Sequence, residues 1–229
     1  MTTTKQVQQL VKPLLERNRD VVLIGRSLYL VPFTHIARSV VIDRCSDVDG
    51  FVPSWTFKET YRPTDMFAKS FGWYADRLAH PVTKSGNWLV TDPTMAGDLL
   101  SYLETDILPW LRSVDTLEKY LQAVRGHRDA EVHLAREVGL FPSIVLGDLT
   151  NAQAIWRTIG PEYVKGRDTG WRYYQPVYDK ICNLGEPLMA GDRAALARLL
   201  HRWEEDNILG TKVAPYWVPA PFPLEGAPV

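Results

Sequence analysis

Cysteine is scarce in this chain of 229 residues, and its two cysteines, Cys45 and Cys182, lie in unrelated segments. Because no CxxC spacing is present, we expect neither a disulfide framework nor a cysteine-based zinc site. A chain of this length buries roughly 70% of the surface that it exposes when unfolded, so it needs no such crosslink in order to fold. The sequence therefore predicts two free thiols and a conventional apolar core.

Neither sign of charge dominates, because 26 Lys and Arg residues face 27 Asp and Glu residues, for a net charge of -1. This balance gives no broad attraction to nucleic acid or to anionic lipid. Apolar runs such as Val21–Ile24 are far shorter than the roughly 20 residues that span a bilayer. Residues 1–7 also lack the apolar core of a secretory signal. We expect a cytoplasmic protein without a membrane span, for which nucleic acid is an unlikely partner.

The sequence also lacks the local motifs of common enzymes: GxSxG, GxxxxGK[ST], GxGxxG after a strand, HExxH and the EF-hand loop. Catalytic residues that only folding brings together escape such a search. His127 and His133 are six positions apart, which separates them by about 120° around a helix, so we predict no metal site and no cofactor. We expect His35, His80 and His201 to be structural or exposed. The balance favours a protein that is not an enzyme.

The first 92 residues predict one helix and an antiparallel meander. Residues 4–17 repeat apolar side chains at helical spacing around Pro13, which predicts a kink or a late helix start. Residues 20–31 and 36–45 are rich in β-branched residues and predict a hairpin. Residues 51–58 alternate apolar and polar side chains, which is typical of a strand with one solvated face, and Pro53 predicts an edge or a bulge. Residues 86–91 predict a short fourth strand.

After residue 92 the patterns are helical, beginning with an apolar stripe from Leu99 to Leu111. Further helices are predicted over residues 117–124, 130–138, 150–159, 173–184 and 192–207. The segregation of strands and helices predicts an α+β fold. We expect a helix plus β-meander over residues 1–92, a helical lobe packed on it over residues 93–209, and an extended Pro-rich, aromatic tail over residues 210–229.

Three arginines, Arg26, Arg38 and Arg44, interrupt the apolar strands of the predicted sheet. Arg38 and Arg44 share one face of their strand, since they are separated by an even number of residues. If that face lines a cleft, the three guanidinium groups can hold a phosphate or a carboxylate through bidentate hydrogen bonds. The alternative is that they pair with nearby aspartates at the rim of the sheet and cover the core with their aliphatic stems.

Two segments combine aromatic side chains with features of a partner surface. Basic and aromatic residues interleave at Trp171, Arg172 and Tyr173, which is typical of a surface for a partner. In the tail, Tyr216, Trp217 and Phe222 alternate with prolines. These three side chains either dock on their own chain or bind a partner or a neighbouring subunit.

The run Val22–Leu30, which follows the opening helix and begins the meander, resembles uncharacterised bacterial α+β domains of the domain-of-unknown-function type. The resemblance covers at most the first ~120 residues and implies a fold, but no residue role. Our first functional hypothesis is a non-enzymatic binding or adaptor protein whose partner is another protein or its own subunit. The alternative is an enzyme or nucleotide-handling protein with the anion site at Arg26, Arg38 and Arg44.

Overall fold

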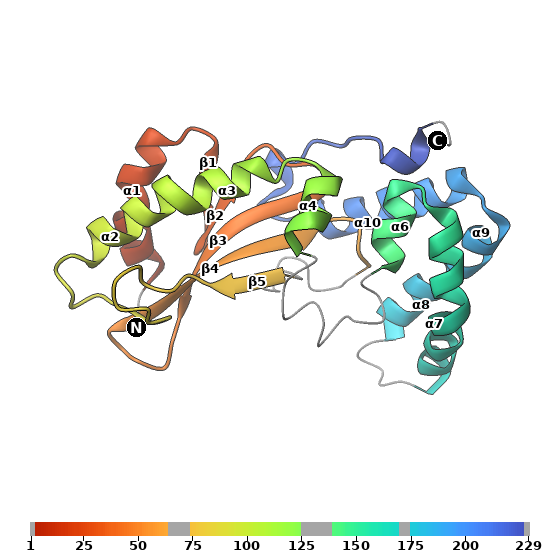
Figure 1. The fold of residues 1–229 in the computed structure, drawn as a ribbon, viewed down its shortest axis with the longest axis horizontal. Helices are drawn as coiled ribbons and strands as arrows, with labels where there is room; N and C mark the ends of the chain where they lie inside the picture. The colour runs from red at the N-terminus through yellow and green to blue at the C-terminus, as the bar shows by residue number, and fades with distance from the viewer. Residues whose placement is uncertain (1–2, 64–73, 125–138, 170–174, 227–229) are drawn as a thin grey trace. The chain divides into compact units, whose positions relative to one another are not determined.

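The computed structural model describes residues 3–63, 74–124, 139–169 and 175–226, which form two compact units. Unit 1 holds the described residues within 1–59, 71–123 and 212–218, and unit 2 holds those within 60–70, 124–211 and 219–229. A helix, then an antiparallel sheet, then a helical region follow one another along the chain, which confirms the predicted α+β class (Figure 1). None of the helices in these ranges has the length and apolarity of a membrane span.

The first helix, α1 (Thr4–Arg17), begins well before Pro13 and contains it. Its start is fixed by Thr3, whose hydroxyl accepts a hydrogen bond from the Gln6 amide at 3.2 Å while the Gln6 side chain accepts one from the Thr3 amide at 2.7 Å. This reciprocal capping box satisfies two amides that have no partner within the helix. The buried side chains Val7, Val11 and Leu14 follow the predicted helical stripe.

The sheet is antiparallel throughout, in the order β1-β2-β3-β4-β5, with β6 also paired to β4. The strands are β1 (Val21–Ile24), β2 (Ser27–Leu30), β3 (Ile36–Arg44), β4 (Gly50–Glu59), β5 (Tyr74–Arg77) and β6 (Trp88–Leu89). About four strands were expected, and the described residues form six. One reason is that residues 20–31 fold into a tight hairpin by themselves, because Gly25 takes a φ of +66° that glycine adopts without steric strain.

The register of β3 on β4 defines two faces of the sheet. Val40 lies opposite Trp55 on what we call the aromatic face, and Ser39 lies opposite Thr56 on the polar face. The polar face was expected to meet solvent, and for β4 this is wrong, since Thr56 is 0% and Lys58 4% exposed. β4 is a central strand, and the Ser39 and Thr56 hydroxyls satisfy one another at 2.8 Å, so that polar side chains are buried there with a partner.

Pro53 lies where β4 changes its second neighbour. Gly50 and Phe51 pair with β6, whereas the pairing with β5 begins at Ser54. The Pro53 carbonyl accepts a hydrogen bond from the Leu78 amide at 2.8 Å, so the backbone nitrogen of Pro53 faces this same side of the strand. A proline is tolerated in this central strand because its missing donor falls at the gap between β6 and β5.

A continuous helical rod lies over the aromatic face, as Figure 1 shows. It consists of α2 (Met95–Tyr102), the π-helical segment η1 (Leu103–Ile107) and α3 (Leu108–Ser113), and α4 (Leu117–Val124) follows it. The Trp110 ring lies 5.0 Å from Trp55 and 5.5 Å from Phe57, and the Tyr120 ring lies 5.5 Å from Phe57. These edge and tilted contacts form the core of unit 1.

Unit 2 is helical and is organised around its longest buried helix, α10. Its helices are α6 (Leu140–Leu146), α7 (Leu149–Thr169), α8 (Gln175–Cys182), α9 (Gly185–Ala190) and α10 (Arg193–Ile208), with a short 3-10 turn η3 (Pro223–Glu225). Asp192 caps α10 by accepting a hydrogen bond from the Ala195 amide at 2.9 Å, as its position before the apolar stripe predicts. Trp203 of α10 meets Phe141 of α6 with ring centroids 6.3 Å apart.

The tail docks on its own chain in both units. In unit 1, Phe33 donates its amide to the Tyr216 carbonyl at 3.1 Å, after the 3-10 turn η2 (Ala214–Tyr216) has turned the chain. In unit 2, Phe222 is 2% exposed, and its ring lies 5.7 Å from Tyr61 and 4.8 Å from His201. Docking in cis was one of the two predicted alternatives for these aromatic residues.

Replacing Phe222 by alanine tests how much this docking contributes to stability. Deleting a fully buried aromatic ring removes apolar contact and leaves a cavity, so we expect Phe222→Ala to lower the free energy of unfolding by about 3–5 kcal/mol in urea titrations. The control Val218→Ala removes a tail side chain that is 48% exposed, and a change within about 0.5 kcal/mol is expected. Equal stability of the two variants would contradict an energetically important cis docking.

Lys58 gives the stability of the protein a specific pH dependence. Burial lowers the pKa of Lys58 from its ordinary 10.5 to about 8. Between these two values the unfolded chain binds more protons than the folded one, so the free energy of unfolding rises with pH. Relative to Lys58→Met, wild type should gain about 1 kcal/mol of stability between pH 7 and pH 9.

Urea titrations of both proteins at pH 7 and pH 9 measure this difference and cancel the titration of other groups. A wild-type stability that runs parallel to that of Lys58→Met over this range would show that the ammonium group is not desolvated in the folded state.

Candidate functional site

A pocket of about 310 Å³ opens in unit 1 between the loop that follows β5 and the helical rod. The loop contributes His80, Pro81 and Val82, and the rod contributes Asp98, Ser101, Tyr102, Thr105 and Asp106. Its size is at the lower end of the range for small-molecule sites. The described residues that line it all belong to unit 1, so the geometry of these walls follows from the packing of that unit.

Trp88 supports the wall of the pocket that the loop forms. It lies on β6 opposite Phe51 of β4, is 1% exposed, and donates its indole N–H to the Leu78 carbonyl at 2.8 Å. The His80 ring packs on the Trp88 ring with centroids 4.5 Å apart. The short fourth strand that the sequence predicts thus serves to place a tryptophan under a histidine.

The hydrogen bonds of the loop determine which tautomer His80 adopts. Nδ1 accepts hydrogen bonds from the backbone amides of Val82 at 3.2 Å and Thr83 at 3.3 Å. The loop is closed by the His80 amide, which donates to the Ser85 carbonyl at 2.8 Å, and by Lys84, which takes a left-handed φ of +60°. Since Nδ1 accepts, the proton of the neutral imidazole is on Nε2.

Nε2 of His80 is a buried donor of a residue that lines the pocket. The residue is 6% exposed, and within the described part of the chain no hydrogen bond reaches this nitrogen. Its nearest charged atom is Oδ2 of Asp98, 3.7 Å away, which is beyond hydrogen-bond distance. A buried donor without an acceptor is costly, and such groups in native structures call for an explanation.

The start of α2 places the carboxylates of the opposite wall. The Thr94 hydroxyl lies 2.6 Å from Oδ2 of Asp98 and 3.0 Å from Oδ1 of Asp92, and its single proton can serve one of them at a time. Hydrogen bonds from the Thr94 backbone and hydroxyl lower the pKa of Asp92. Negative charge therefore gathers where α2 begins.

The π-helical segment η1 brings Thr105 and Asp106 into the same wall. Its apolar residues explain it: Met95, Leu99, Leu103, Ile107 and Leu111 are all buried and recur every four residues. On an ideal α-helix such a stripe drifts by about 40° at each step. A π turn holds more residues per turn, so it returns the stripe towards the sheet. Turns of this kind are rare in proteins as a whole, and those that occur are often found at functional sites.

The chemistry of the pocket is that of an acidic cavity with one fixed donor. Asp98 and Asp106 supply carboxylates, and the described residues that line the cavity include no lysine or arginine. Across the described residues no cluster of three His, Cys, Asp or Glu side chains has the arrangement of a metal site. His80 also presents a protonated nitrogen, which has no lone pair for a metal. The arrangement suits a small organic molecule.

The three arginines of the predicted anion site are not brought to one point. Arg38 donates to the carbonyls of Leu111 at 3.3 Å and Val114 at 3.0 Å, at the C-terminal end of α3. Burial lowers its pKa. Arg26 donates to the Ile42 carbonyl at 2.7 Å, and burial and then the nearby Arg44 lower its pKa. Six residues of extended strand, roughly 20 Å, separate Arg38 from Arg44.

The predicted partner surface is divided by the structure. Trp171, Arg172 and Tyr173 lie outside the described residues. Tyr216 and Trp217 are half-buried beside Phe33, and the Trp217 indole nitrogen is buried without a hydrogen bond there. Phe222 is in the core of unit 2. The backbone at Tyr216 and Trp217 and the side chain of Phe222 are therefore engaged in cis.

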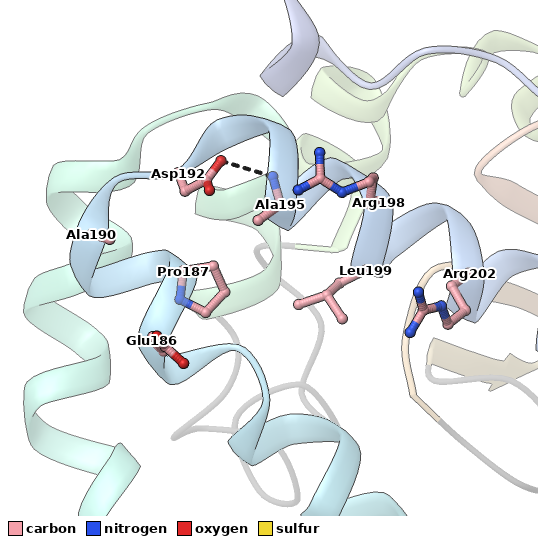
Figure 2. Close-up of a pocket in the computed structure, with 8 residues that line it drawn as sticks. All are labelled: Glu186, Pro187, Ala190, Asp192, Ala195, Arg198, Leu199 and Arg202. Carbon is pink, nitrogen blue, oxygen red and sulfur yellow. Dashed lines mark hydrogen bonds between the residues drawn. The ribbon is translucent and has the colours of Figure 1, made fainter.

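A second hollow, of about 370 Å³, lies between α9 and α10 in unit 2 (Figure 2). Arg198 and Arg202 border it on α10, and Glu186 lies on α9. Asp192, which also lines it, is occupied as the helix cap. Two acids and two bases select no ligand charge, so this hollow is a weaker candidate than the His80 pocket.

Sequence spacing does not reveal the pocket, because its residues come from two separate segments, the loop at 80–82 and the rod at 98–106. His80 was expected to be structural or exposed, and it is buried. One local signal exists: in His80-Pro81-Val82-Thr83 a side-chain acceptor precedes two free amides, the arrangement of a side-chain-capped turn. The pairing of that turn with Asp98 and Asp106 has no counterpart in sequence spacing.

No family model, curated protein or solved structure matches this chain. The resemblance of residues 22–30 to uncharacterised bacterial α+β domains stays a prediction.

Replacing Arg38 by alanine separates a structural role from an anion site. It leaves the carbonyls of Leu111 and Val114 without their charged donor, so we expect the free energy of unfolding to fall by about 1–3 kcal/mol. Arg44→Ala, at an exposed position on the same strand face, is the control and should change it by about 0.5 kcal/mol or less. Urea unfolding measures stability, and thermal shift with inorganic phosphate measures anion binding. A phosphate-dependent shift that both variants lose would restore the anion site.

Proposed function

We propose that this chain is a binding protein that holds a small organic molecule in the pocket beside His80. The observation that carries the proposal is the His80 side chain: a buried ring that lines the pocket, locked in one tautomer by two backbone amides, with its remaining donor unpartnered among the described residues and 3.7 Å from Oδ2 of Asp98 on the opposite wall. A bound acceptor would satisfy this donor, which is how ligand sites obtain orientation from a few placed polar groups.

Several features support binding in this pocket over the alternative anion site. The guanidinium of Arg38 is engaged with the end of α3, whereas the His80 pocket has polar groups on two walls that share a cavity. The free thiols Cys45 and Cys182 support a cytoplasmic location, where thiols stay reduced. The proposal narrows the predicted binding function to a small molecule and leaves a protein partner as a separate hypothesis.

Filling the pocket tests the proposal. Ser101 is exposed on the pocket wall, and Ser101→Trp should occupy the cavity without disturbing the core of the rod. The matched control is Ser113→Trp, at an exposed serine of the same rod that does not line the pocket.

The measurement is a fragment library screened by amide NMR on the full chain. Hits in wild type should shift the Val82 and Thr83 amides, persist in Ser113→Trp and lose at least tenfold in affinity in Ser101→Trp. If no fragment shifts these amides, or if Ser101→Trp binds the hits as wild type does, the proposed function is wrong.

A further inference from the structure

We infer that the His80 pocket selects a vicinal amino alcohol: a protonated amine with a neutral oxygen acceptor on the adjacent carbon. This inference rests on the proposed function and names its ligand class. It follows from two features, the charge of the pocket walls and the short distance between one acceptor and one donor.

The charge of the pocket calls for a cation. Asp98 and Asp106 both line it, Asp92 shares the Thr94 hydroxyl with Asp98 at the start of α2, and the described lining residues include no lysine or arginine. The side chain of Asp98 is 41% exposed, so it is accessible to a ligand. An ammonium group bound there forms a charge-assisted hydrogen bond, which is about twice as strong as a neutral one.

The donor of His80 calls for an acceptor on the same ligand. Nε2 of His80 and Oδ2 of Asp98 are 3.7 Å apart, so an atom bound to one is next to an atom bound to the other. Two substituents on neighbouring carbons in a gauche arrangement lie about 3 Å apart, which matches this spacing. An amine on Asp98 therefore places a vicinal oxygen on His80.

The acceptor is expected to be neutral. A carboxylate or phosphate would bring negative charge beside Asp98 and Asp106, and like charges in a partly desolvated site repel. A hydroxyl avoids this repulsion and accepts from the neutral imidazole. Free amino acids and phosphorylated amines should thus be discriminated against.

Three matched probes separate the two contacts: trans-2-aminocyclohexanol carries both groups, cyclohexylamine lacks the acceptor, and cyclohexanol lacks the cation. Each is titrated into the full 15N-labelled chain at pH 7, and the shifts of the Val82 and Thr83 amides report binding, because these amides donate to Nδ1 of His80. We expect the amino alcohol to bind at least tenfold more tightly than either other probe.

Two variants assign the ammonium contact. Asp98→Asn keeps an acceptor for Thr94 and removes one charge, so affinity for both amines should fall about tenfold while that for cyclohexanol is unchanged. Asp115→Asn removes an acid of unit 1 that pairs with Lys119 and does not line the pocket, and it should bind all three probes as wild type does.

Equal affinity for the amino alcohol and cyclohexylamine would overturn the inference, and so would equal losses in the two variants. If these probes fail while other fragments shift the Val82 and Thr83 amides, the ligand class is wrong and the proposed function stands. If nothing in the library shifts them, both are wrong.

Discussion

The contact of Trp110 with Trp55 and Phe57 is the constraint on which the rest of unit 1 depends. These large rings hold the helical rod on the aromatic face and fix its rotation about its own axis. Arg38 holds the C-terminal end of the rod, and near its middle Glu104 accepts two hydrogen bonds from Arg17, at 2.9 and 2.8 Å, which lowers the pKa of this carboxyl. With rotation and position fixed, the remaining side of the rod presents its acids and hydroxyls to the loop of His80.

The pocket joins a rigid wall to a wall held by backbone hydrogen bonds. On the rod, position depends on packing, because the π turn follows from an apolar stripe of period four. On the loop, position depends on the indole of Trp88 and on the amides that Nδ1 of His80 accepts. Such double support, by stacking and by hydrogen bonds, is the way preorganised sites hold a polar group in one orientation.

The fold class followed from the sequence because its signals are local: the helical spacing of apolar residues in residues 4–17, the period of two in residues 51–58 and the helical stripes after residue 92. What sequence patterns missed depends on tertiary context. The hairpin within residues 20–31 depends on the positive φ of Gly25. The burial of Thr56 depends on the hydroxyl of Ser39, which is 17 residues away in the sequence. The pocket was missed for the same reason, since it unites His80 with Asp98 across two elements. Arg38 was expected to hold an anion or to pair with a nearby aspartate, and in the structure it donates to backbone carbonyls at the end of α3.

In unit 2, too, a position in the structure depends on contacts between distant residues, here around a buried glutamate. Glu204 is fully buried, accepts the Thr60 hydroxyl, and lies with Oε2 3.4 Å from Nδ1 of His201. The other ring nitrogen of His201 meets Glu225 of the tail at 2.7 Å. A carboxylate removed from water needs such partners, since desolvation without them costs several kcal/mol. These contacts, which run from Thr60 through Glu204 and His201 to Glu225, therefore fix the position of the tail along α10. In that position Phe222 is buried in the core. Burial of apolar side chains alone would bind the tail to unit 2, but these polar contacts determine the position at which it binds.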